Sequence, residues 1–442
     1  MPRVAFVPLT GFRLREQEML SLGMSLPGLR SRQQAIGQLA PLGLLTMAGM
    51  LPDHWNCSWH PVERVTDQLI DELVRESPDF VAISALTASI HEAFELSRRL
   101  RAQNLLPIIG GLHATVCPDE VISNGAIAVV GSGELTWMQL LKDVETSSTR
   151  LRYEASGTPA EWPQPRFELL GHRPPRFTLQ TQRGCPFVCD FCGASRLLGR
   201  FAEKPLDNIR AELAAIQKLQ RRPLIELADD NTFAGNRAVE PLLDVLSESG
   251  ARWFTESDWR IGERPEVLRR LADSGCVQVL VGIESMVFRY PGMGAKQAEL
   301  DRVLRAVEAI QEAGVAVNAC FILGADGETR TSVDRLIEFL LMAPFAEIQL
   351  TLQTPFPGTG LFQRLHNNGR MLAHRDWSFH TLFDVTYQPD CLTVAELERA
   401  FRDAVRTVFS SEPCRRRESI RDKIWAKRFA TSNCYQLSGD ET

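Results

Sequence analysis

Three cysteines on one short segment constrain this chain more than any other feature. Cys185, Cys189 and Cys192 stand in the run Arg-Gly-Cys-Pro-Phe-Val-Cys-Asp-Phe-Cys-Gly, with the spacing Cys-x3-Cys-x2-Cys. Thiolates at this spacing can hold three corners of a cubane iron–sulfur cluster. No fourth cysteine follows on the segment, so the fourth iron is left open for a ligand. The flanking glycines and Pro186 let a tight loop wrap a compact cofactor, which argues against three unconnected buried thiols.

This spacing, with Phe191 directly before the last cysteine, resembles the radical S-adenosylmethionine (SAM) superfamily. The resemblance implies a 4Fe-4S cluster whose open iron binds the amino and carboxylate groups of SAM. Reductive cleavage of SAM then usually yields a 5′-deoxyadenosyl radical. It further implies that backbone groups of Phe191 face the adenine, and that an external one-electron reductant of the flavodoxin or ferredoxin type is needed.

Composition excludes several classes of protein. A chain of 442 residues is too long for one hydrophobic core and predicts two or three domains. The net charge of −6 provides no attraction for nucleic acid or an anionic membrane. No apolar stretch of about eighteen residues and no leader-like start occurs, so neither a membrane span nor a signal peptide is expected.

The other seven cysteines are scattered, and each is expected to be a reduced packing thiol. A disulfide scaffold is not expected in so long a chain, which predicts a reducing compartment, the cytoplasm. Cys391, Cys414 and Cys434 could form a second metal site, but their wide and irregular spacing favours packing.

Residues 1–145 predict a Rossmann-like, doubly wound α/β domain. Apolar runs that read as buried parallel strands alternate with amphipathic helical segments. The strands are expected at 4–9, 80–84, 106–109 and 126–130, and the helices at roughly 38–51, 67–76, 89–103 and 135–146. Ligands of such a domain bind beyond the carboxyl ends of the strands.

Glycine-rich motifs stand at those strand ends. The phrases Ser-Ala-Leu-Thr, Gly-Gly-Leu-His-Ala-Thr and Gly-Ser-Gly-Glu resemble cobalamin-binding domains and the cobalamin-dependent branch of radical SAM enzymes. The axial-histidine signature Asp-x-His-x-x-Gly has no match, so a histidine lower ligand to cobalamin is not expected. The alternative is a domain that has lost its ligand and only scaffolds. The resemblance implies cobalamin contacts at Ser84, Leu86, Thr87, Gly110, Gly111, His113, Gly131, Gly133 and Glu134.

The rest of the chain divides into three expected parts. A proline-rich linker covers 146–177, a partial barrel of about six β/α repeats covers 178–372, and a helical region covers 373–442. The barrel strands are expected at 223–227, 253–256, 277–283, 315–323 and 347–352. Helices are expected near 206–220, 237–249, 265–274, 300–313, 330–343 and 393–409.

Polar clusters follow the barrel strands, where barrel chemistry is located. Glu284, in the phrase Gly-Ile-Glu-Ser, is the strongest single candidate for a SAM contact outside the cysteine loop. Ordinary turns and helix caps remain alternatives for each cluster taken alone. The resemblance implies SAM contacts at Phe191, Asp229, Asp230, Asn231, Glu256, Arg260, Glu284, Ser285 and Gly324. The candidates on the substrate side are Tyr290, His380 and Tyr387.

The resulting hypothesis is a cobalamin-dependent radical SAM enzyme that transfers a methyl group to an unactivated carbon of a small metabolite. Such a carbon has no acidic proton, so acid–base chemistry cannot prepare it, whereas a radical can. The first alternative is a cyclase, oxidoreductase or rearrangement enzyme with the same cofactors and no methyl transfer. The second is an iron–sulfur sensor or scaffold.

Overall fold

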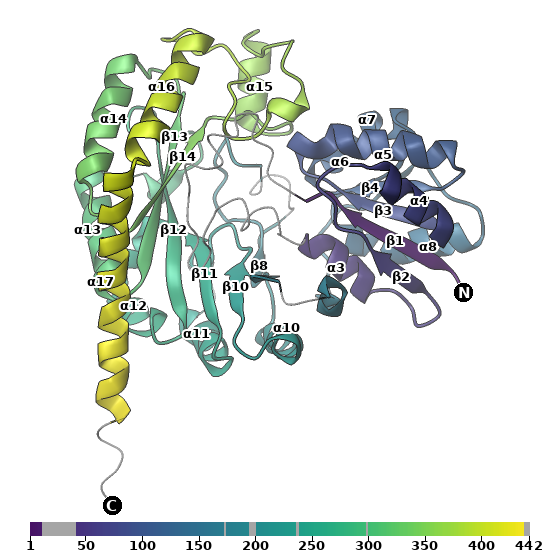
Figure 1. Cartoon of the computed structure of the whole chain (residues 1–442), viewed down its shortest axis with the longest axis horizontal. Helices are drawn as coiled ribbons and strands as arrows, with labels where there is room; N and C mark the ends of the chain where they lie inside the picture. The colour runs from purple at the N-terminus through teal and green to yellow at the C-terminus, as the bar shows by residue number, and fades with distance from the viewer. Residues whose placement is uncertain (11–40, 172–173, 194–199, 236–237, 298, 437–442) are drawn as a thin grey trace, which may run out of the picture.

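The computed structural model describes residues 1–10, 41–171, 174–193, 200–235, 238–297 and 299–436, and for 428–436 the helix backbone alone. Two parallel six-stranded sheets form the two halves of the molecule (Figure 1). Residues 38–40, the start of the first expected helix, lie outside the described residues. Both sheets carry helices, so the predicted α/β class is confirmed.

The first sheet has the strand order β2-β1-β3-β4-β5-β6. Its strands are β1 (Arg3–Pro8), β2 (Asn56–Trp59), β3 (Phe80–Ser84), β4 (Pro107–Gly110), β5 (Ile127–Val130) and β6 (Arg152–Glu154). The four central strands are those that the apolar runs predicted. The edge strands β2 and β6 were not predicted, because Asn-Cys-Ser-Trp and Arg-Tyr-Glu carry no buried apolar run. Strand β6 also lies within the segment that was expected to be only a linker.

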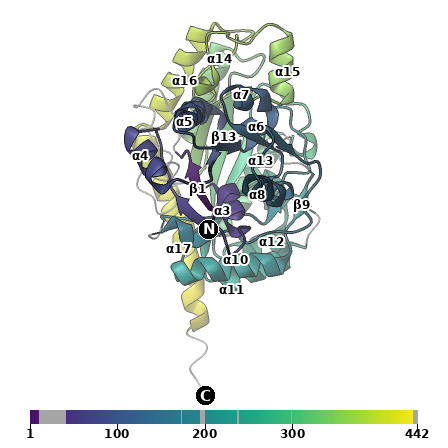
Figure 2. The same cartoon turned by 90° about the vertical axis from the view of Figure 1, so that its right-hand side faces the viewer.

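Alternate residues of the first sheet enter two separate cores. Ala5 and Val7 pack with helices α4 and α5, whereas Val4 and Phe6 pack with α3 and α8 on the opposite face. Figure 2 shows the two helix pairs on either side of β1. The helical segments here are α3 (Leu42–Gly49), α4 (Asp67–Glu76), η1 (Thr87–Ser89), α5 (Ile90–Ala102), α6 (Leu112–Val116), α7 (Pro118–Ser123), η2 (Gly133–Leu135) and α8 (Trp137–Glu145).

The second sheet is an open, all-parallel partial barrel with the order β14-β13-β12-β11-β10-β7. Its strands are β7 (Phe177–Leu179), β10 (Leu224–Leu227), β11 (Arg252–Ser257), β12 (Cys276–Glu284), β13 (Ala316–Leu323) and β14 (Glu347–Leu352). A small hairpin of β8 (Gln182–Arg183) and β9 (Ala202–Glu203) leads into and out of the cysteine loop. The strand periodicity places Val317, Ala319 and Phe321 against the outer helices, so Cys320 and Ile322 face inward.

The outer layer of the barrel and the C-terminal region are helical, as predicted. The helical segments are η3 (Phe167–Leu170), α10 (Leu206–Leu219), α11 (Val239–Glu248), η4 (Trp259–Glu263), α12 (Pro265–Leu271), η5 (Gly294–Lys296), α13 (Leu300–Glu312), α14 (Arg330–Met342), α15 (Gly360–Asn367), η6 (Trp377–Phe379), α16 (Val394–Val408) and α17 (Ser411–Gln436). Helix α17 packs on β13 and β14. Within the described ranges, none of the helices is both long and apolar enough to cross a membrane.

Candidate functional site

The cysteine loop follows β8 and is held by a second loop that follows β12. Asp190 donates its backbone N–H to the Pro291 carbonyl at 2.9 Å. Gly292 has a φ of +82°, and a Cβ there would come within 2.0 Å of the Val188 carbonyl oxygen. Glycine is therefore required where the two loops touch.

A cavity of about 450 Å³ lies between the two halves of the molecule, and all three loop cysteines line it. The first domain contributes residues that follow β3 and β4, including Leu86, Thr87 and Leu112. The barrel contributes residues at or beyond the carboxyl ends of its strands, where barrel sites are formed. Among these are Asp230, Glu256, Glu284, Ile322, Gln353 and Thr354.

Glu284 reaches this cavity through an irregular end of β12. The pairing of β12 with β13 shifts register between Gly282 and Glu284, and Glu284 adopts a φ of +70°. A Cβ on Gly282 would come within 2.3 Å of Glu284 Oε1, so Gly282 makes room for this carboxylate. A non-glycine residue in the left-handed region is uncommon and costs free energy that the surrounding structure must compensate. The predicted candidate therefore lies at a strained point of the cavity wall.

The carboxylates of the cavity have raised pKa values. Burial, with the negative charge of Asp230 as the next cause, raises the pKa of Glu256 to about 8, although its side chain is open to the cavity itself. Burial beside Asp229 raises the pKa of Asp230 to about 6. Burial also raises the pKa of Glu284. The cavity thus disfavours excess negative charge and suits a cationic ligand group.

Lys296 is a positively charged side chain in the lining of this cavity, and the sequence prediction missed it. Its own burial opposes the charged form, but the negative charge of Glu284 raises its pKa above the usual value. Its backbone carbonyl accepts a hydrogen bond from Trp259 Nε1 at 2.7 Å, which fixes the turn. The signal in the sequence was the glycine-rich turn Gly-Met-Gly-Ala-Lys that follows the strand predicted at 277–283.

Two of the loop thiols have raised pKa values. Burial raises the pKa of Cys185, and raises that of Cys189 to about 11, so both are protonated thiols at neutral pH and must release protons when they bind metal. Among the described residues, no three His, Cys, Asp or Glu side chains converge on one point as ligands of a single metal ion. A cubane binds its thiolates through separate irons, and all three loop thiols line the one cavity.

Several predicted SAM contacts lie outside this cavity lining. Asp229 is fully buried, and its carboxylate accepts hydrogen bonds from the Thr181 and Gln182 backbone N–H groups at 2.7 and 3.1 Å. Asn231 and Arg260 both donate to Asp258, so they brace the end of β11. These side chains support the wall that Asp230 and Glu256 occupy.

Two more predicted SAM residues stabilise or form turns after barrel strands. Ser285 caps the loop after β12 by accepting from the Val287 and Phe288 N–H groups. Gly324 has a φ of +93° and accepts a hydrogen bond from the Tyr387 hydroxyl through its carbonyl. Phe191, in contrast, lines the cavity and lies 4.5 Å from Tyr290, ring centroid to ring centroid.

Two of the three substrate-side candidates line the cavity, and the third does not. Tyr290 and His380 line the cavity, and Tyr290 donates its hydroxyl proton to Gln353 at 2.9 Å. Burial lowers the pKa of His380 to about 4, so this imidazole is neutral. Tyr387 is fully buried behind the cavity, and its hydroxyl donates a hydrogen bond to the Gly324 carbonyl. The residue type alone does not show whether a tyrosine lines a cavity or lies behind its wall.

A second cavity, of about 430 Å³, lies at the carboxyl ends of β3, β4 and β5. Six predicted cobalamin positions line it: Ser84, Gly110, Gly111, Gly131, Gly133 and Glu134. A Cβ on Gly133 would come within 3.1 Å of Met47 Sδ, so the missing side chains make the space. Met47, Val129 and Trp137 give it an apolar wall. Glycines at these positions leave the backbone open to a bulky ligand.

The other predicted cobalamin positions lie elsewhere. Leu86 and Thr87 line the cavity between the domains. His113 is buried, and its ring lies 5.4 Å from that of Trp377 in η6, so it joins the first domain to the C-terminal region. Glu134, which lines the second cavity, is ion-paired at 2.5 Å with Arg183, two residues before the first loop cysteine. Sequence reasoning missed this interdomain pair.

The fold and its two cavities define a two-domain α/β protein with a ligand-binding first domain and a thiol-lined partial barrel. The family model of the radical SAM superfamily matches residues 179–340, and that of the B12 binding domain matches residues 34–141. Both domains are therefore present, and the chain is a cobalamin-dependent radical SAM enzyme. A 4Fe-4S cluster, SAM and cobalamin are its cofactors.

Similar proteins cover most of the chain. Bacteriochlorophyllide d C-12(1)-methyltransferase of Chlorobaculum tepidum is 24% identical over 399 residues, covering 87% of this chain and 86% of that protein. Anaerobic magnesium-protoporphyrin IX monomethyl ester cyclase of Cereibacter sphaeroides is 23% identical over 408 residues, covering 82% and 65%. The solved structure of TsrM, a radical SAM methyltransferase from Kitasatospora setae, shares the fold with a TM-score of 0.63 and 16% identity, covering 91% of this chain and 85% of that one.

Proposed function

We propose that this enzyme is a C-methyltransferase that acts on an unactivated carbon of a small metabolite. The observation that carries the proposal is the contact between the two cavities. Leu112 lines both of them, and the short segment from Ser84 to Thr87 passes from one to the other. A substrate in the interdomain cavity would therefore lie between the cysteine loop and the cobalamin domain.

The residues have separate roles in this proposal. The bound cofactors supply reductive cleavage of SAM and a transferable methyl group. Cys185, Cys189 and Cys192 hold the cluster. Asp230, Glu256 and Glu284 offer carboxylates to the cationic and hydroxyl groups of SAM, and Lys296 offers a cation to its carboxylate.

The cavity wall also positions the substrate and excludes water. Tyr290 and His380 are the proposed substrate contacts, and the neutral imidazole suits an uncharged substrate group. In the second cavity Ser84, Gly110, Gly111, Gly131 and Gly133 are the proposed cobalamin contacts. We place the end of the cobalamin domain after Glu154, because β6 completes its sheet.

The similarity to the methyltransferase of Chlorobaculum tepidum supports methyl transfer. The test uses enzyme purified anaerobically from cobalamin-fed cells, with a reduced flavodoxin or ferredoxin as electron donor. It is incubated with methyl-labelled SAM and a metabolite extract. The proposal predicts S-adenosylhomocysteine and 5′-deoxyadenosine in step with a product that carries the label. If neither accompanies turnover, the proposal is wrong.

A cyclase or oxidoreductase without methyl transfer is the second candidate, because the cyclase of Cereibacter sphaeroides is almost as similar. In the same experiment this function would yield 5′-deoxyadenosine without S-adenosylhomocysteine and without transfer of the label.

A further inference from the structure

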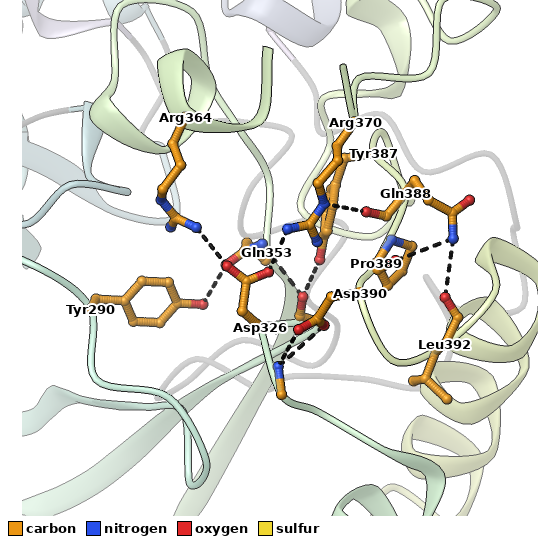
Figure 3. A network of polar contacts seen from close by, with 12 residues as sticks. Tyr290, Asp326, Gln353, Arg364, Arg370, Tyr387, Gln388, Pro389, Asp390 and Leu392 are labelled. Carbon is orange, nitrogen blue, oxygen red and sulfur yellow. Dashed lines mark hydrogen bonds and ion pairs between the residues drawn. The ribbon is translucent and has the colours of Figure 1, made fainter. Parts of the chain in front are cut away.

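An ion-pair network lies next to the cysteine loop, outside the lining of either cavity. Arg364 of α15 donates to Asp326 at 2.6 Å and to Asp190 at 3.2 Å. Arg370 donates to the other oxygen of Asp326 at 2.8 Å and to the Gln388 carbonyl at 2.7 Å. Figure 3 shows both arginines reaching down to Asp326. Two guanidinium groups thus meet two carboxylates, and the four charges balance.

Asp190 is the member of this network that belongs to the loop. It follows Cys189 directly and precedes Cys192 by two residues. Its side chain is only 9% exposed, whereas that of Asp326 is 22% exposed. A buried carboxylate is costly unless a counter-charge and hydrogen bonds compensate it. Arg364 supplies the counter-charge and one hydrogen bond, which reaches Asp190 Oδ2.

Helix α15 also holds the backbone of Asp190. The Leu361 N–H donates to the Asp190 carbonyl at 2.9 Å. A Cβ on Gly360 would come within 3.2 Å of Asp190 Cβ, so glycine allows the helix to pack this closely. One turn later, Arg364 reaches the side chain of the same residue. The helix therefore fixes the peptide that separates the second and third cysteines.

We propose that Arg364 is a positioning residue that holds the cysteine loop in the conformation that retains the cluster. It acts through Asp190 and does not touch a cofactor. The proposal depends on the cluster but not on whether a methyl group is transferred, so it can fail while the proposed function stands. The competing explanation is that the network only stabilises the fold.

Arg370 distinguishes these two explanations. It binds the same Asp326, but its other hydrogen bond goes to the Gln388 carbonyl and not to the cysteine loop. The variants are Arg364→Met, Arg364→Lys and the matched control Arg370→Met. Each is reconstituted anaerobically. The readouts are iron per chain, the rate of iron loss to a ferrous chelator, the EPR spectrum of the reduced cluster with and without SAM, and the melting temperature.

The proposal predicts that Arg364→Met loses iron about tenfold faster, since a charge-assisted hydrogen bond is removed, and that its EPR spectrum changes. Arg364→Lys should restore part of the retention. Arg370→Met should lower the melting temperature but keep the rate of iron loss and the spectrum. Equal iron loss from wild type and Arg364→Met, or an equal increase in Arg370→Met, would overturn the proposal.

If Arg364→Met does not fold, Asp190→Asn tests the same contact while it keeps the shape of the side chain. The proposal then predicts faster iron loss and an altered spectrum from Asp190→Asn. A wild-type rate and spectrum in this variant would overturn it.

Discussion

The two cavities make room for their ligands in different ways. The wall of the interdomain cavity carries the ionisable groups of Asp230, Glu256 and Glu284, which lie at the ends of barrel strands, and of Lys296 in η5. The first-domain cavity is shaped mainly by glycines and an apolar wall, and Glu134 at its edge is already paired with Arg183. One cavity is specified by charge and the other by shape, so changes of charge and of size should separate them.

The largest effect is expected from a change that removes the ligand of one cavity and leaves the ligand of the other in place. Cys189→Ala should abolish cluster binding because the second of three thiolate ligands is lost, while cobalamin stays bound. Iron, sulfide and corrin analysis with an absorption spectrum measures both. Cys320→Ala is the control, since Cys320 lines the same cavity from β13 but lies outside the loop. A normal cluster in Cys189→Ala would show that the ligand assignment is wrong.

Gly110→Trp should produce the reverse result. The indole would fill the first-domain cavity and exclude cobalamin, whereas iron content should remain that of the wild type. Gly110→Ala is the control, because a Cβ at this position finds its nearest neighbour, Val129 Cβ, at an ordinary 3.6 Å. Corrin bound to the Trp variant at the wild-type ratio would contradict the assignment of this cavity.

Lys296→Met should affect only the interdomain cavity, because it removes one charge from the wall of that cavity. SAM affinity is expected to fall about 10- to 100-fold, the usual effect of losing a charge-assisted hydrogen bond, with cobalamin affinity unchanged. The measurement is the titration of SAM into reconstituted enzyme, followed by EPR. Lys296→Arg should recover most of the affinity, and equal affinities in all three proteins would exclude this role.

The smallest effect is a pH dependence confined to one cavity. The pKa values of Glu256 and Asp230, about 8 and about 6, lie above those of ordinary carboxyls, so both groups gain protons as the pH falls from 9 to 6. Their negative charge is then lost, and SAM affinity should fall several-fold over this range. Cobalamin affinity should stay constant. In Glu256→Gln the change near pH 8 should disappear, and an unaltered profile would contradict the role of Glu256.

Local patterns predicted the central strands and part of the set of residues that line the cavities. Buried apolar runs identify β1, β3, β4 and β5, because each strand is covered on both faces. The short edge strands β2 and β6 were not predicted, because they form by pairing with β1 and β5 and carry no apolar run of their own. Strand-end motifs located Glu256 and Glu284, but the same motifs could not separate Asp230, which faces the cavity, from Asp229, which braces it.

The sequence by itself determined the class of enzyme and its cofactors, because the cysteine spacing and the glycine motifs are local patterns along the chain. Only the tertiary structure decided how the cysteine loop is held. Arg183 meets Glu134 across 49 residues of sequence, and Arg364 meets Asp190 across 174. Ion pairs of this kind are set by the packing of whole domains and helices, so no local pattern specifies them. Lys296 shows the same limit, since it lines one cavity with loop cysteines that lie more than a hundred residues earlier in the chain.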